Sequence, residues 1–196
     1  MKKEIVDMMK KMITLALAAL MVLGMVACGG SDKANGNGNG FGADSAVAVL
    51  ENVWAQYADD EKFAVMGGDY DNNVMDAPAA FNYENPEYMD GMLAIPAEAT
   101  AMVDDAASLM HMMNANTFTA GAFHLADAAN EDAFVAAVKE SVMNRQWMCG
   151  FPEKLIIVSD GNGYVVTAFG HGDAVNPFTA KLTEMGGTVI VEENIG

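Results

Sequence analysis

Basic residues are scarce in this chain of 196 residues. Lys and Arg together number 10, whereas Asp and Glu number 27, and the formal net charge is −17. Such a charge argues against nucleic acid as a partner, because the phosphates would repel the protein. It also argues against a domain that lies flat on an anionic membrane. The charge suits a solvated domain, or one that meets cations or basic partners.

Cysteine is scarcer still, since only Cys28 and Cys149 occur. The segment 147–152 around Cys149 is apolar and carries no base or cation that would favour the thiolate. We therefore expect Cys149 to be a buried structural residue and not a nucleophile. Because Cys28 is expected to be lipidated, as argued below, no internal disulfide can form, and stability must come from the core.

Motifs for catalysis and phosphate binding are missing as well. The chain has no Walker loop, no dinucleotide-binding fingerprint, no nucleophile elbow and no His-Glu-x-x-His. We therefore predict that the protein is not an enzyme and uses no cofactor. No catalytic, cofactor-binding or metal-ligating residue is assigned from the sequence.

The first 27 residues have the composition of an export signal. Lys2 and Lys3 stand near the start, and an apolar run occupies residues 12–27 with only Thr14 and Gly24 interrupting it. A membrane-spanning helix needs roughly twenty apolar residues, so this run is short. Small residues and a glycine-rich stretch follow it, which is typical of a cleaved signal peptide.

The residues before Cys28 resemble a bacterial lipobox. Met25-Val26-Ala27 supplies an aliphatic residue and two further apolar residues before the obligatory cysteine, although leucine is more usual than Met25. The resemblance implies cleavage before Cys28, lipidation of its sulfur and a membrane anchor facing the outside of a bacterial cell. Each buried methylene contributes about 0.8 kcal/mol, so two or three acyl chains such as palmitate anchor stably where one would not. The alternative is an ordinary secretory signal or short helical anchor, with Cys28 incidental.

Three regions follow from this interpretation. Residues 1–27 are the lipoprotein signal peptide, residues 28–43 are a flexible Gly/Asn tether, and residues 44–196 are a single acidic α+β domain. The tether has an r.m.s. reach of roughly 20 Å. Without the signal peptide the chain carries 25 acidic and 6 basic residues, a net charge of −19.

The first part of the domain has weak patterns. Asp44 or Ser45 can cap a helix whose apolar residues recur at helical spacing as far as Tyr57. Residues 59–86 are predicted to be loop with at most one short element, and Pro96 is expected to open a second helix. We predict helix to about Ala107, and leave residues 108–113 open between helix and strand.

The second part is clearer. Strands are predicted for residues 117–125, 155–158, 164–169 and 188–191, with helices starting at Asn130 and at Asn176-Pro177. The segment 160–163, Asp-Gly-Asn-Gly, predicts a tight hairpin turn. The resulting order β-α-β-β-α-β predicts a ferredoxin-like antiparallel sheet with both helices on one face. The N-terminal helices would pack beside it.

The chain resembles small surface lipoproteins of anaerobic Gram-positive bacteria that carry a domain of unknown function. The resemblance rests on the lipobox, the tether, the segment 113–118 (MNANTF) and the segment 146–152 (QWMCGFP) before a hairpin. It covers most of residues 44–185. It implies a surface lipoprotein of unassigned activity and carries over no site residue.

Polar clusters offer candidate sites with simpler explanations. The segment 69–73 matches the first ligands of a calcium loop, but Val74 and Ala80 stand where the loop needs glycine and a bidentate acid, so a polar turn is favoured. The soft ligands of segment 110–113 suit Cu(I), yet methionine packing in the core explains them better. His124 on a strand and His171 in a loop near Asp173 have no partner at a fixed spacing.

The sequence therefore favours a lipid-anchored extracytoplasmic binding or interaction module whose protein or small-molecule partner is unknown. Cys28 is the only functional residue assigned. The alternatives are a cell-envelope enzyme or accessory factor acting on wall polymers or peptides, and an acidic metal-binding lipoprotein. A flat or apolar groove would favour the binding module, and a pocket with convergent His, Asp and Cys side chains would favour the enzyme.

Overall fold

The computed structural model describes residues 40–113, 118–148 and 150–196. These residues belong to one compact unit, Gly36–Gly196. The predicted signal peptide, Cys28 and most of the tether lie outside the described residues, and so does Cys149. In the part of the chain that is described, no helix is both long and apolar enough to cross a membrane.

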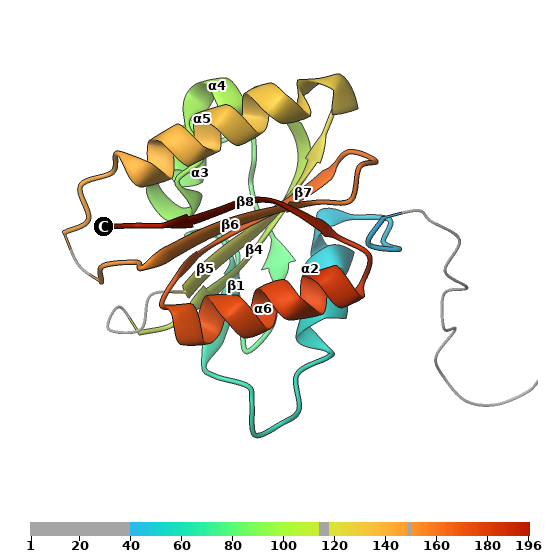
Figure 1. Cartoon of the computed structure of the whole chain (residues 1–196), viewed down its shortest axis with the longest axis vertical. Coiled ribbons are helices and arrows are strands. Elements are labelled where there is room, and N and C mark those ends of the chain that lie inside the picture. The colour runs from blue at the N-terminus through green and yellow to red at the C-terminus, as the bar shows by residue number, and fades with distance from the viewer. Residues whose placement is uncertain (1–39, 114–117, 149) are drawn as a thin grey trace, which may run out of the picture. The chain divides into compact units, whose positions relative to one another are not determined.

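One antiparallel sheet of eight strands forms the centre of the domain (Figure 1). Every strand pairing in it is antiparallel. The strand order is β2 (Asn73–Met75), β1 (Val65–Gly68), β4 (Val103–His111), β5 (Phe118–Leu125), β7 (Tyr164–Gly170), β6 (Lys154–Ser159) and β8 (Thr188–Asn194). The short β3 (Ala79–Ala80) also pairs with β4. The predicted α+β class is confirmed.

Helices cover both faces of the sheet (Figure 1). The helices α2 (Ala46–Trp54) and α6 (Gly172–Glu184) pack on one face. The helices α3 (Pro86–Leu93), α4 (Ala97–Thr100) and α5 (Glu131–Met143) pack on the other. The sequence of β6 reflects this burial, because Ile156 and Val158 face one core while Leu155 and Ile157 face the other. A continuous aliphatic run is typical of a strand covered on both sides.

The predicted placement of both helices on one face is wrong. The element order from β5 to β8 is β-α-β-β-α-β as expected, but β8 pairs with β6, whereas a ferredoxin-like sheet places its last strand beside its first. The connection from β5 through α5 to β6 and the connection from β7 through α6 to β8 therefore both cross the sheet toward its β8 edge. They start from β5 and β7, which run in opposite directions. Right-handed crossovers then put α5 and α6 on opposite faces.

The predicted helix up to Ala107 is also wrong. As expected, Pro96 precedes a helix, but α4 ends at Thr100, and β4 occupies Val103–His111 as a central strand. Residues 108–111, for which helix and strand were both left open, therefore belong to a strand. Buried small residues (Ala106, Ala107, Ser108) fill both faces of β4, so the strand shows no alternation of polar and apolar residues.

Residues 59–86 contain three short strands, β1 to β3, where at most one short element was expected. Their glycines have a packing role. A Cβ atom on Gly67 would lie 2.2 Å from the backbone nitrogen of Ala79, so only glycine lets these segments approach. The strands are two to four residues long, and this leaves no periodic pattern to detect.

Several local predictions are confirmed. Ser45 caps α2, and its hydroxyl accepts the backbone N–H of Ala48 at 3.2 Å. The hairpin at residues 160–163 forms, with the Asp160 carboxylate accepting the backbone N–H groups of Asn162 and Tyr164. The helix α6 begins at Gly172, four residues before the predicted start, and contains Pro177.

Candidate functional site

Four adjacent strands, β5, β7, β6 and β8, each have one terminus at the same side of the domain, which we call the pocket end of the sheet. The strand register aligns Lys154 of β6 with Gly170 of β7 and with Asn194 of β8. On β5, Phe118 pairs with the same Gly170. The loop between α5 and β6, the first residues of α6 and the two residues after β8 therefore meet at this end of the sheet.

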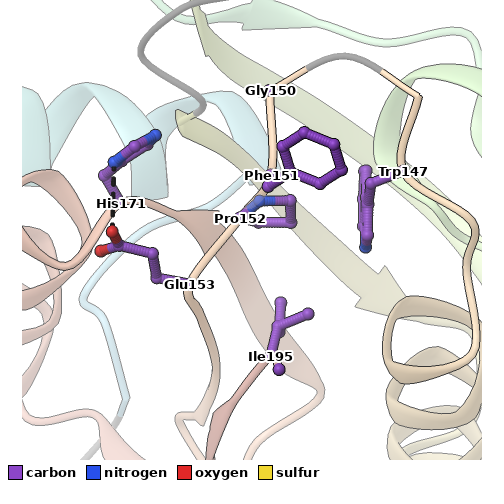
Figure 2. A pocket seen from close by; sticks show the side chains of 8 residues that line it. Trp147, Gly150, Phe151, Pro152, Glu153, His171 and Ile195 are labelled. Carbon is purple, nitrogen blue, oxygen red and sulfur yellow. Dashed lines mark ion pairs between the residues drawn. The ribbon is translucent and has the colours of Figure 1, made fainter.

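A pocket of about 600 Å³ lies at the pocket end (Figure 2). It is open to solvent on one side, and its walls come from three separate parts of the chain. They are Trp147, Gly150, Phe151, Pro152 and Glu153 before β6, His171 at the start of α6, and Ile195 and Gly196 after β8. A hollow of this size accommodates a small molecule or a few side chains of a peptide.

Most of the lining is apolar. Trp147 packs against Phe169 of β7 with ring centroids 5.2 Å apart, so its ring is held by the core. Phe151 lies across from Trp147 and is 70% exposed (Figure 2). The neighbouring Met148 is 89% exposed. Adjacent exposed apolar side chains are costly in water and mark binding surfaces.

One polar pair lines the opposite wall. The Nδ1 atom of His171 lies 3.5 Å from a carboxylate oxygen of Glu153 (Figure 2). The second carboxylate oxygen accepts the backbone N–H of Gly172 at 3.0 Å, which satisfies one of the free donors at the start of α6. His171 was predicted to lie near Asp173, but its carboxylate partner is Glu153. The pair can donate and accept hydrogen bonds at the edge of an apolar pocket.

Residues 40–196 carry 24 Asp and Glu residues but only five Lys and Arg residues, and all five cations form ion pairs. The pairs are Lys62 with Asp59, Lys139 with Glu193, Arg145 with Asp90, Lys154 with Glu192, and Lys181 with Glu61. The described domain thus has no unpaired cation to attract an anionic ligand. Neutral or cationic ligands are favoured.

A second His–carboxylate pair lies at the other end of the sheet, which we call the acidic end. On β5, the Nδ1 atom of His124 lies 2.5 Å from the carboxylate of Asp104 on β4. A hollow of about 440 Å³ opens at the same end and is lined mainly by polar residues, among them Asp44, Asp160 and Asn162. The sequence could not indicate the pair because residue 104 was assigned to a helix.

The other sequence-derived candidates have structural roles. Asp69 is 2% exposed, and its carboxylate accepts the backbone N–H groups of Asp71, Asn72 and Asn82. The segment 69–73 forms the polar turn that was predicted. Met110 is buried in one core, whereas His111 stacks on Phe63 with ring centroids 5.2 Å apart. Within the described ranges, no three His, Cys, Asp or Glu side chains are grouped to hold a metal ion.

The pocket itself was missed by the sequence interpretation. The apolar segment 147–152 was predicted only to surround a buried Cys149, and no functional role was predicted for Trp147. The only signal that could have indicated the pocket is a run of large apolar residues next to Gly150 and Pro152, outside any regular element.

Comparison of the chain with protein-family models, curated proteins and solved structures finds no match.

Proposed function

We propose that this protein is a lipid-anchored extracytoplasmic binding module that holds its ligand in the pocket at the pocket end of the sheet. The observation that carries the proposal is an apolar hollow of about 600 Å³ with the exposed Phe151 facing Trp147. The firmly packed Trp147 and the strand ends provide a rigid base for it. A preorganised base reduces the conformational entropy that is lost when a ligand binds.

The anchoring part of the proposal rests on the sequence. Cys28 follows a short apolar run, and the part of the predicted tether before Phe41 can space the acidic domain from a membrane. Phe41 itself is 4% exposed and packs in the core of the domain. The membrane is thus one partner, reached through lipidated Cys28, and the pocket serves a second partner. The resemblance to surface lipoproteins with a domain of unknown function supports the same location, on the outer side of the cell membrane.

The two rival functions receive less support. An envelope enzyme would use His171 and Glu153 as an acid–base pair, but the described lining residues include no serine, threonine or lysine beside them to act as a nucleophile. A metal-binding role would need convergent ligands, and the Asp69 carboxylate that seemed suitable is occupied by three backbone N–H groups.

Fractionation of the native cells tests the anchor. Wild-type protein should be processed and membrane-bound, whereas Cys28→Ala protein should remain unprocessed or appear in the soluble fraction. Membrane binding and processing at the wild-type level in the Cys28→Ala variant would contradict lipidation.

Photo-cross-linking in the same cells tests the pocket. A photoreactive residue at position 151 should give discrete cross-linked products, and one at position 70 should not. Tyr70 is a matched control because it is 65% exposed, close to the 70% of Phe151, and is outside the pocket lining. Equal patterns from both positions would show that the pocket has no dedicated ligand.

A further inference from the structure

The strand β8 leaves one long edge of the sheet open. Within the described residues it pairs only with β6, although it is seven residues long. Backbone N–H and C=O groups of alternate residues along such an edge face outward and can pair with another extended segment. Peptide recognition by strand addition uses edges of this kind.

The open edge leads directly into the pocket. Ile195 and Gly196 follow β8 without a break, and both line the pocket. The backbone N–H of Ile195 donates to the carbonyl oxygen of Glu153 at 2.8 Å, which keeps this segment beside β6 (Figure 2). A strand paired with β8 would thus have one end at the pocket, next to Trp147.

A second apolar contact lies in the middle of the edge. The register between β6 and β8 shifts so that Val191 pairs with Ile157 and Val189 pairs with Val158, which leaves Ile190 without a partner. Ile190 is 39% exposed. A bulge of this kind hinders flat pairing between two identical edges, while Ile190 still offers an apolar contact to a different strand.

The charge of the domain selects the partner. All five cations of residues 40–196 are paired, and most of the 24 carboxylates are not paired with a cation. On β8 itself Glu192 and Glu193 are paired with Lys154 and Lys139, so the selection comes from the net charge of the domain. A second copy of this chain would carry the same net negative charge and be repelled. An extended basic segment is complementary in charge, and its backbone can satisfy the open edge.

We propose that β8 accepts a basic peptide segment as an additional antiparallel strand, with an apolar side chain of the peptide seated in the pocket. Since every pairing in the sheet is antiparallel, the N-terminal end of the peptide lies at the pocket. The inference rests on the proposed binding function and names its ligand class. About six residues of added strand span roughly 20 Å, the length of the edge.

The test uses the full lipidated chain in phosphatidylcholine nanodiscs and a labelled peptide, Phe-Lys-Val-Lys-Val-Lys. Binding is measured by fluorescence anisotropy, and amide hydrogen exchange reports where the peptide lies. We expect saturable binding with slowed exchange in β8. Replacing the three lysines by glutamates should weaken binding at least tenfold, and so should N-methylation of alternate peptide bonds. Absence of binding at 1 mM peptide, or binding unaffected by N-methylation, would overturn the proposal.

A pair of matched variants locates the peptide on the sheet. Ile190→Lys places a cation on β8 and should weaken binding at least tenfold, whereas Val74→Lys on the opposite edge strand β2 should change it less than twofold. Both residues are exposed aliphatic side chains on edge strands, at 39% and 46%. Equal effects of the two variants would contradict strand addition at β8.

Two further outcomes separate this inference from the proposed function. Specific cross-linking from position 151 in cells, combined with no slowing of exchange in β8, would refute peptide addition and leave the binding function intact. Concentration-dependent dimers in sedimentation that Ile190→Lys abolishes would identify a second copy of the chain as the occupant and overturn the proposal.

Discussion

The two ends of the sheet each carry a histidine beside a carboxylate, in opposite surroundings. At the pocket end, His171 and Glu153 lie 3.5 Å apart beside Trp147 and Phe151. At the acidic end, His124 and Asp104 lie 2.5 Å apart. The four side chains are similarly accessible, between 33% and 62% exposed, so burial does not distinguish the pairs.

The neighbours of each pair make the difference. Next to His124 is the ring of Tyr164, at 4.8 Å between centroids. Burial raises the pKa of Tyr164, and the carboxylates Asp105 and Asp160 raise it further. This end is an acidic surface. At the pocket end the pair borders an apolar hollow. A His–carboxylate pair alone therefore does not indicate a binding site, whereas an apolar pocket beside such a pair is typical of one.

The largest effect is expected from truncating the aromatic side chain at each end. Trp147→Ala should lower the free energy of unfolding by about 2–3 kcal/mol, because the half-buried ring loses its packing against Phe169. Tyr164→Ala should cost about 1 kcal/mol, because its smaller ring packs against the partly exposed His124 and not against a buried aromatic ring. Urea unfolding followed by far-UV circular dichroism measures both, with Trp147→Phe as the control that keeps a ring. A larger loss for Tyr164→Ala would reverse the comparison.

The hairpin at the acidic end provides the next test. Gly163 has φ +108°, and a Cβ atom there would lie 3.4 Å from Nε2 of His124. Gly163→Ala should destabilise the protein by about 1–2 kcal/mol because of backbone strain. Gly91→Ala in α3 is the control, because nothing lies within 4 Å of its Cβ position, and it should raise stability by up to about 1 kcal/mol. Thermal unfolding that shifts the same way for both variants would contradict this account.

Removing the hydroxyl group of Tyr57 should stabilise the protein, in contrast to the truncations above. Tyr57 is 5% exposed, and its hydroxyl has no hydrogen-bond partner among the described residues. Tyr57→Phe should therefore raise the free energy of unfolding by about 1 kcal/mol at pH 7.

Alkaline pH sharpens this prediction. Burial, followed by the Glu61 carboxylate, raises the pKa of Tyr57 above its ordinary value of 10.0. The folded state keeps the phenolic proton where the unfolded chain has released it, so this contribution is intact below pH 10 and is lost as the pH rises further. The Tyr57→Phe variant should lose less stability than wild type between pH 9 and pH 11. Parallel pH profiles would show that folding does not raise the pKa of Tyr57.

The smallest effect is expected for the two ion pairs themselves. Double-mutant cycles with His124→Ala and Asp104→Ala, and with His171→Ala and Glu153→Ala, should both give coupling free energies below about 1 kcal/mol. The coupling should be larger for the shorter pair, His124 with Asp104. A coupling above 2 kcal/mol at the pocket end would point to a stronger role for that pair.

The sequence was informative where short-range chemistry decides structure. Ser45 as a cap, the turn at residues 160–163 and the aliphatic strand 155–158 were all predicted and all form. The pocket could not be predicted in the same way. Its described lining comes from Trp147, from residues 150–153, from His171 and from residues 195–196, and the sequence holds no signal that these segments meet.

The sequence by itself determined the α+β class, the acidic charge, the order of elements after residue 117 and the prediction of Cys28 as the anchor. Caps, turns and apolar runs act within a few residues, so they can be read locally. Tertiary structure decided that residues 103–111 form a central strand, that β8 lies beside β6, and that α5 and α6 cover opposite faces. These features depend on contacts between distant segments, where packing outweighs local preference. The open edge of β8 beside an apolar pocket is their consequence.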